Sequence, residues 1–96
     1  RNRFLSPSQR RAAASLARAL RAGRERIRAG ERRTAPVIRA MRALIAAQPG
    51  TRLDYVALVD AETLTPRRTI QGRVALLVAA WVGRTRLIDN LLVEVS

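Results

Sequence analysis

The sequence predicts an α+β fold in which two helices pack on one face of a small antiparallel sheet of about three strands. Three observations support this prediction. Apolar residues recur at helical spacing in the first half of the 96-residue chain. Short apolar runs rich in valine and leucine follow in the second half. A glycine separates the last two runs, where a tight turn would form a hairpin. A chain of this length forms one domain.

A long amphipathic helix is predicted from Pro7 to about Ala29. The segment Ser6–Gln9 is a good helix start, since serine caps free N–H groups, proline suits the first turn and Gln9 completes a capping box. Gly30 is placed to cap the other end. Gly23 is expected to weaken the middle of the helix by about 1 kcal/mol relative to alanine. The predicted apolar stripe consists of Ala13, Leu16, Ala17, Leu20 and Ile27.

A second helix is predicted to begin near Thr34 as its N-cap, with Pro36 in the first turn. The segment Gln48–Gly50 ends this helix, because it carries both proline and glycine. The side chains predicted to face the core are Val37, Met41, Leu44 and Ile45, and we interpret Met41 as core filler.

Three strands are predicted after the helices. The first runs from Arg52 to Asp60, and a loop from Glu62 to Gly72 follows it. Apolar residues occupy every position from Val74 to Val82, which favours a strand covered on both faces. Gly83-Arg84 forms the hairpin turn, and the last strand continues from Thr85 to Val95.

The composition excludes several classes of function. The chain has no histidine and no cysteine, so it lacks the usual zinc ligands and the commonest general base, and an independent hydrolase or metalloenzyme is not expected. Asp54 and Asp60 would lie about 20 Å apart on one strand, too far for a shared site. With no leader and no apolar run of about 20 residues, we expect a soluble, cytoplasmic protein and no membrane partner.

Charge leaves one alternative open. All 19 basic residues are arginine, and 7 acidic residues leave a net charge of +12, which attracts phosphates and other anions. A free-standing arginine-rich module that binds RNA or another anionic partner is therefore the second hypothesis. One Tyr, one Trp, one Phe and no recognised RNA-binding motif argue against it. We therefore interpret the arginines of the long helix as a solvated face and do not expect nucleic acid as a partner.

Three segments carry a family resemblance. Residues Ala79 to Asn90 read AAWVGRTRLIDN, which resembles the C-terminal signature of the pantothenate synthetases, or pantoate-beta-alanine ligases. Residues Arg1 to Ser6 resemble the end of the family's Met-Ser-Ser-Arg-Asn-Arg-Tyr-Leu segment, and Leu53 to Asp60 resembles its Asp-Tyr strand. Phe4 stands where Tyr is usual and Ala61 where Pro is usual, and neither departure touches chemistry. The resemblance covers the whole chain.

The resemblance implies that residues 1–96 are the C-terminal lid domain of such a ligase. The N-terminal Rossmann-like domain, with the family's His-x-Gly-His motif and catalytic lysine, is absent from this chain. In the family, ATP activates pantoate as pantoyl adenylate with release of pyrophosphate, and beta-alanine then displaces AMP to give pantothenate. No catalytic residue is therefore expected here, and the isolated domain should be inactive. The resemblance further implies that ATP with Mg²⁺ is bound mainly by the absent domain, and that the full-length protein is a homodimer.

By motif match, Arg1 is the last residue of the segment that grips the ATP phosphates in the family. A guanidinium suits that role, because it donates two parallel hydrogen bonds to phosphate oxygens. Asn2 and Arg3 are weaker candidates, with a role in supporting the domain junction. Four polar residues of the signature are further candidates: Arg84, Arg86, Asp89 and Asn90. We expect them to build the lid and its hinge, with Asp89 held by Arg86 or by a backbone turn.

Overall fold

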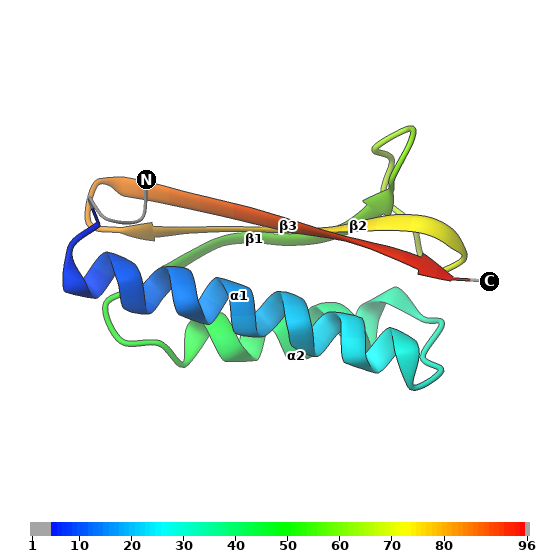
Figure 1. Ribbon diagram of the computed structural model, residues 1–96, viewed down its shortest axis with the longest axis horizontal. Helices are drawn as coiled ribbons and strands as arrows, with labels where there is room; N and C mark the ends of the chain where they lie inside the picture. The colour runs from blue at the N-terminus through cyan, green and yellow to red at the C-terminus, as the bar shows by residue number, and fades with distance from the viewer. Residues whose placement is uncertain (1–4, 96) are drawn as a thin grey trace.

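The computed structural model describes residues 5–95, in which two helices lie side by side across one face of a three-stranded antiparallel sheet (Figure 1). The elements in chain order are α1 (Pro7–Arg28), α2 (Thr34–Ala46), β1 (Arg52–Asp60), β2 (Gly72–Val82) and β3 (Thr85–Val95). The strands lie in the order β1-β2-β3, so the central strand β2 pairs with both neighbours. The predicted α+β fold is confirmed. Neither helix within residues 5–95 is long and apolar enough to cross a lipid bilayer.

The start and end of α1 follow the prediction. The hydroxyl of Ser6 accepts a hydrogen bond from the Gln9 N–H at 3.2 Å, and the Gln9 side-chain oxygen accepts one from the Ser6 N–H at 2.9 Å. This reciprocal pair is the capping box. After the C-cap Ala29, Gly30 adopts a φ of +114° and its N–H donates to the carbonyl of Ile27 at 3.0 Å. Glycine is favoured there because a Cβ is strained at positive φ.

The buried face of α1 is rotated from the predicted stripe. Ala13 and Ala17 are only half-buried, so their assignment to the core is wrong. They line a groove between α1 and β3, whereas the opposite flank of the helix is covered by α2. The predicted stripe left this flank out, although its small residues Ala12, Ser15, Ala19 and Gly23 are buried. The buried residues of α1 are Ala12, Ser15, Leu16, Ala19, Leu20, Gly23 and Ile27.

Gly23 marks the closest approach of α1 to its neighbours. A Cβ built at this position would lie 2.7 Å from the Met41 sulfur and 3.0 Å from Leu76 Cδ1. Met41 is fully buried, as predicted for a core residue. The prediction that Gly23 weakens the helix relative to alanine is therefore corrected. An alanine here would improve helix propensity, but it would also overpack the core against α2 and β2.

Two predictions for α2 are wrong. The N-cap is Arg33 rather than Thr34, and the Thr34 N–H donates instead to the carbonyl of Arg68 at 3.0 Å. A loop contact thus supplies the acceptor that a capping side chain usually provides. Leu44 is 37% exposed, because it lies on the flank of the buried stripe instead of at its centre. The three fully buried residues of α2 are Val37, Met41 and Ile45.

The central strand β2 is buried on both faces, as predicted, although it begins at Gly72 rather than Val74. The two helices cover only one face of the sheet. Ala79 lies on the other face of β2, yet its side chain is 0% exposed. Its cross-strand partners are Tyr55 on β1 and Ile88 on β3, which are 38% and 66% exposed. Their larger side chains shield the alanine between them. The β2 residues that join the core beneath the helices are Val74, Leu76, Val78 and Ala80.

The side chain of Asp60 organises the loop between β1 and β2. One carboxylate oxygen accepts hydrogen bonds from the N–H groups of Thr63 and Glu62 at 2.9 and 2.8 Å. The other oxygen accepts from Arg67 at 3.0 Å. These N–H groups, with that of Thr63 contributing most, and the Arg67 charge lower the pKa of Asp60.

This arrangement predicts a pH-dependent part of the stability. Since the folded-state pKa of Asp60 is lowered, its contribution is complete above the ordinary aspartate pKa of roughly 4 and is lost as the pH falls further. We expect the Asp60→Asn variant to melt at a lower temperature than wild type at pH 7. At pH 2.5 the difference between the two melting temperatures should be smaller. Glu62→Gln is the matched control, and an equal Asp60→Asn effect at both pH values would contradict the prediction.

Candidate functional site

The residues that the sequence assigns to phosphate binding and junction support, Arg1, Asn2 and Arg3, lie outside the described residues. The described chain begins at Leu5 and passes at once into α1. At this end of the domain, the start of α1 lies beside the hairpin turn between β2 and β3 (Figure 1).

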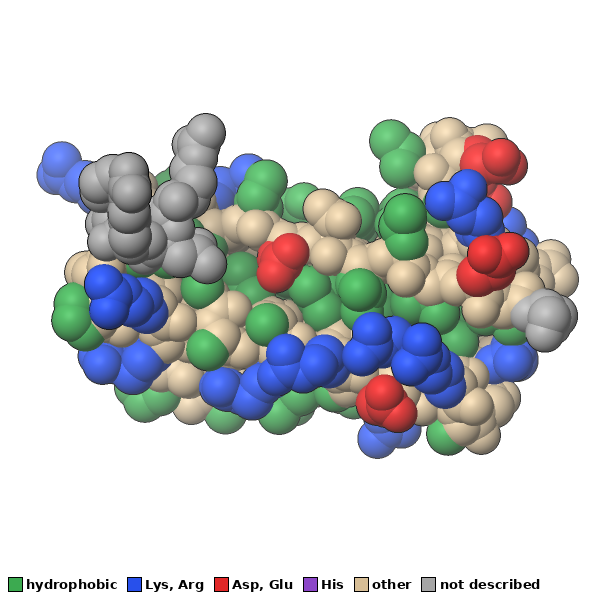
Figure 2. All heavy atoms as spheres, in the orientation of Figure 1, with side chains coloured by type: hydrophobic (Ala, Val, Ile, Leu, Met, Phe, Trp, Pro, Cys, Tyr) green, Lys and Arg blue, Asp and Glu red, His purple; other side chains and the backbone are tan. Residues whose placement is uncertain are grey.

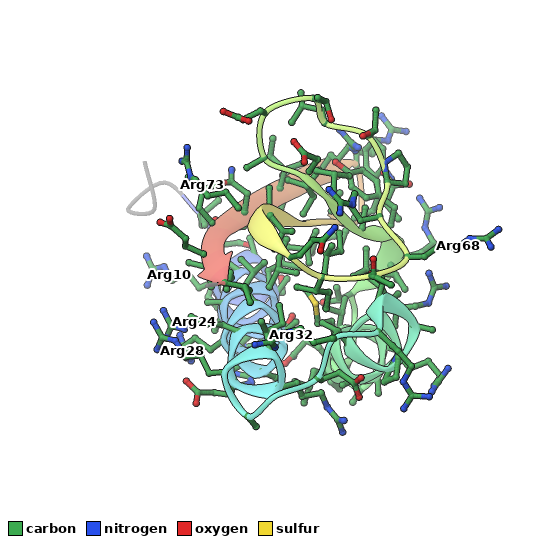
Figure 3. All side chains as sticks on the ribbon, turned by 90° about the vertical axis from the view of Figure 1, so that its right-hand side faces the viewer. Arg10, Arg24, Arg28, Arg32, Arg68 and Arg73 are labelled. Atoms are coloured by element: carbon green, nitrogen blue, oxygen red, sulfur yellow. The ribbon has the colours of Figure 1, made fainter. Side chains whose placement is uncertain are left out.

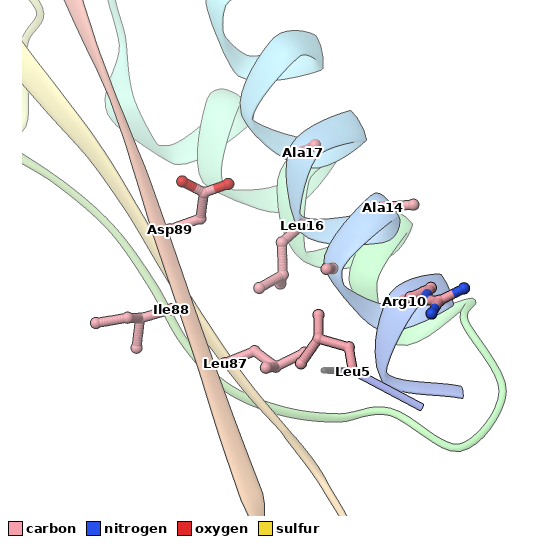
Figure 4. A pocket seen from close by; sticks show the side chains of 9 residues that line it. Leu5, Arg10, Ala14, Leu16, Ala17, Leu87, Ile88 and Asp89 are labelled. Carbon is pink, nitrogen blue, oxygen red and sulfur yellow. The ribbon is translucent and has the colours of Figure 1, made fainter. Parts of the chain in front are cut away.

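A groove of about 770 Å³ separates the first half of α1 from β3 (Figure 4). Leu5 and Leu87 point toward one another within it, and Leu16 contributes to its apolar floor. Arg10 on α1 and Asp89 on β3 also line the groove, and the guanidinium group of Arg10 is directed away from β3. The complete lining is Leu5, Arg10, Ala13, Ala14, Leu16, Ala17, Leu87, Ile88 and Asp89.

A single side-chain amide connects the start of α1 to the hairpin. The Gln9 nitrogen Nε2 donates to the hydroxyl oxygen of Thr85 at 2.9 Å, and Gln9 Oε1 accepts from the Ser6 N–H. We call this arrangement the Gln9 bridge. Thr85 is the first residue of β3 and follows the two-residue turn Gly83-Arg84, in which Gly83 has a φ of +59°. The predicted hairpin turn is therefore confirmed, and sequence reasoning missed its partner on α1.

An irregularity in β1 determines which side chains reach the hairpin. Leu53 pairs with Ala80, whereas Tyr55 pairs with Ala79, so Asp54 is an extra residue in the β1–β2 register. Such a β-bulge redirects side chains at that point of a strand. The prediction of β1 gave its bounds correctly but contained no bulge. The bulge places the Asp54 carboxylate where a side chain from β3 reaches it.

The β3 side chain that reaches Asp54 is that of Arg86. Its Nε donates to Asp54 Oδ2 at 2.9 Å, and its guanidinium carbon lies 5.7 Å from the centre of the Tyr55 ring. The hydrogen bond to Asp54 is the main reason that the pKa of Arg86 is raised. On the same face of the sheet, the guanidinium carbon of Arg52 lies 5.8 Å from the Trp81 ring centre. The network spans all three strands and favours a structural role for Arg86.

The other polar residues of the signature, Arg84, Asp89 and Asn90, either contact a neighbour in the sequence or are exposed. Asp89 lies within β3 and accepts a hydrogen bond from the neighbouring Asn90 N–H at 2.8 Å, so it is held neither by Arg86 nor by a backbone turn as predicted. Arg86 pairs with Asp54 instead of Asp89, because the β1 bulge brings a closer carboxylate. Arg84 is exposed at the turn.

The arginines that give the chain its charge point to different sides of the domain. Arg10, Arg24 and Arg28 project from one side of α1, whereas Arg68 projects from the opposite side of the molecule (Figure 3). A row of arginine side chains is visible along the α1 surface (Figure 2). Arg10, Arg28 and Arg68 are exposed. Their distribution over the surface favours a solvated face over a single binding channel.

The side chains of residues 5–95 at the hairpin end can hold and orient neighbouring groups through hydrogen bonds and ion pairs. Within this range, no three His, Cys, Asp or Glu side chains gather where a metal ion could bind. The polar groups at the hairpin end are amides, hydroxyls, guanidinium groups and single carboxylates engaged with neighbours. Fold and site together define a small α+β domain whose polar groups at the hairpin end are engaged with one another.

Comparison with known proteins identifies the family. The model of the family described as pantoate-beta-alanine ligase matches residues 1–92. The chain therefore belongs to the pantoate-beta-alanine ligase family. A pantothenate synthetase from Moorella thermoacetica is 57% identical over 96 residues, which are 100% of this chain and 34% of that relative. One from Roseiflexus sp. is 47% identical over 98% of this chain and 34% of its own length.

The fold agrees with a solved member of the family. The crystal structure of pantothenate synthetase from Thermus thermophilus matches with a TM-score of 0.83 and 40% sequence identity. The match covers 94% of this chain and 32% of that one. The chain thus spans about a third of the length of these relatives. The comparisons do not support the alternative of a free-standing arginine-rich binding module.

Proposed function

We propose that this chain is the C-terminal lid domain of a pantothenate synthetase, joined in the full-length protein to an N-terminal Rossmann-like catalytic domain. One observation carries the proposal. The whole chain aligns with a pantothenate synthetase at 57% identity, yet accounts for 34% of that relative's length. The remaining two-thirds of such a protein provides room for a separate nucleotide-binding domain.

The full-length protein would catalyse formation of an amide bond in two steps. A carboxylate oxygen of pantoate attacks the α-phosphorus of ATP, which gives pantoyl adenylate and releases pyrophosphate. The amine of beta-alanine then attacks the acyl carbon, which gives pantothenate and releases AMP. The N-terminal domain would supply the catalytic groups and would hold most of the ATP with its Mg²⁺.

Arg1 would contribute to the phosphate end of the ATP site. Its guanidinium can donate two parallel hydrogen bonds to phosphate oxygens and offset the charge that builds up on the leaving pyrophosphate. Asn2 and Arg3 would support the junction between the domains. Three residues separate Arg1 from Leu5, so the Cα atoms of the two, four steps apart, lie within about 14 Å of each other. A phosphate site that includes Arg1 is therefore adjacent to the end of the domain where α1 begins.

The proposal extends to assembly and location. The full-length enzyme would be a homodimer formed through the N-terminal domain, and it would act in the cytoplasm, where ATP is available. Support for both statements comes from membership of this biosynthetic family.

Two assays test the proposed function. We expect the 96-residue chain alone to make no pantothenate from ATP, pantoate and beta-alanine, because it lacks the adenylating groups. We expect the full-length protein to release pyrophosphate only when pantoate is present, and to release AMP once beta-alanine is added. Turnover by the purified 96-residue chain would contradict the assignment as a lid domain. A full-length protein without pantoate-dependent pyrophosphate release would contradict the assignment as a ligase.

A further inference from the structure

We propose that Asp89 keeps the free edge of β3 from pairing with the same edge of a second copy of this chain. It does so by holding the backbone N–H of Asn90, which lies at the centre of that edge. The inference goes beyond the proposed function, because it concerns how copies of the domain are kept apart and not the reaction. It also gives a role to the Asp89-Asn90 pair of the signature.

The two edges of the sheet, β1 and β3, differ in how they are covered (Figure 1). On β1, the following loop reaches the edge: the Asp60 N–H donates to the Thr65 carbonyl at 2.8 Å, and the Leu58 carbonyl accepts from the Arg67 N–H at 3.3 Å. The bulge at Asp54 interrupts the start of the same strand. Within residues 5–95, the eleven residues of β3 pair with β2 alone. An edge strand of this length is a template for pairing with another strand.

The hairpin turn determines which backbone groups of β3 face the free edge. A two-residue turn closes on a hydrogen-bonded pair, here Val82 and Thr85. Hydrogen-bonded and non-bonded pairs alternate along antiparallel strands, so the even-numbered residues of β3 direct their N–H and C=O groups away from β2. Asn90 is the middle residue of β3, and its outward N–H donates to Asp89 Oδ1 at 2.8 Å. The carboxylate therefore occupies the central donor of the free edge.

The side chains along this edge are complementary to those of a second copy. If two β3 strands paired antiparallel with the two Asn90 residues opposite each other, Ile88 would lie opposite Leu92, and Arg86 opposite Glu94. Ile88 and Leu92 are 66% and 55% exposed, and Arg86 and Glu94 are also exposed. Apolar pairs and pairs of opposite charge both stabilise neighbouring strands. A second copy of this chain is therefore the partner that the edge fits.

Pairing in this register requires both Asn90 N–H groups to leave their Asp89 carboxylates. Each N–H would have to donate to the carbonyl of the opposite Asn90 instead. A hydrogen bond to a charged group contributes more than one between neutral groups, and the symmetric pair contains this bond twice. Together the two bonds should weaken association by about 100-fold. The net charge of +12 on each copy opposes association further.

The test measures the mass of the full-length protein by light scattering as its concentration is raised. Asp89→Ala removes the acceptor, so we expect the dissociation constant for self-association to fall about 100-fold and the mass to approach twice that of wild type. Asp89→Asn is the matched control, because its side-chain oxygen can still accept from the Asn90 N–H and should preserve the wild-type mass. Adding Glu94→Arg to Asp89→Ala would place like charges opposite each other and should restore the wild-type mass.

Each variant can contradict the inference. An unchanged mass for Asp89→Ala would overturn it, as would a wild type that associates equally strongly. If Asp89→Asn associates as strongly as Asp89→Ala, the hydrogen bond is not what keeps the edges apart. If Glu94→Arg does not reverse the association, the copies join through another surface. Melting temperatures show whether the variants are folded, and Asp89→Val, which lacks the acceptor but favours a strand, replaces an alanine variant that does not fold.

Discussion

Replacing Arg1 with alanine in the full-length enzyme is expected to slow pantoyl adenylate formation by about 100- to 1,000-fold, the usual cost of removing one donor that stabilises developing charge. The physical reason is that charge on the phosphate oxygens increases as pyrophosphate leaves, and a guanidinium can donate two hydrogen bonds to them. The measurement is the rate of pantoate-dependent pyrophosphate release at saturating ATP. The melting temperature of the protein should not change, because the proposed role of Arg1 is to contact the substrate.

Two further variants sharpen this prediction. Arg1→Lys keeps the charge but loses the forked geometry, so its rate should fall between those of wild type and Arg1→Ala. Arg11→Ala is the matched control, because Arg11 is an exposed arginine on α1. An Arg1→Ala enzyme with an unchanged first half-reaction would remove Arg1 from the phosphate site. A comparable loss in Arg11→Ala would instead attribute the effect to overall charge.

Replacing Gly23 with valine is expected to lower the free energy of unfolding by about 1–3 kcal/mol, the range for overpacking a core. Helix propensity alone predicts the opposite sign, since glycine is worse than valine in a helix interior. Packing dominates because even a Cβ at Gly23 would lie 2.7 Å from the Met41 sulfur and 3.0 Å from Leu76 Cδ1. Urea denaturation of the 96-residue chain measures the change.

The cause of the loss can be tested by a double-mutant cycle. Ala14→Val places valine on an exposed position of α1 and should cost only a few tenths of a kcal/mol in helix propensity. Met41→Ala removes the sulfur that a side chain at Gly23 would meet. The Gly23→Val substitution should therefore cost less in the Met41→Ala background than in wild type. Equal costs in the two backgrounds would show that Met41 is not the source of the clash.

Local sequence signals were sufficient for the elements of the fold. Ser6 and Gln9 predicted the start of α1, Gly30 predicted its end, and Gly83-Arg84 predicted the hairpin turn. Each of these signals acts over a few residues, so the chain needs no distant partner to express it. The first strand was predicted with the bounds Arg52 to Asp60 that the structure has. Local signals did not identify the candidate phosphate-binding residue. Arg1 is one of 19 arginines, and only the family resemblance distinguished it.

The sequence by itself determined the class of the fold, the order of its elements and the family signature that spans the last hairpin. Tertiary structure alone decided which face of α1 is buried, that Arg33 rather than Thr34 occupies the N-cap position of α2, and that Leu44 is exposed. It also decided that Asp54 is bulged toward Arg86 and that Gln9 reaches Thr85. The physical reason is the same in each case. These features depend on side chains far apart in sequence, whose distances are fixed only when helices and sheet pack together.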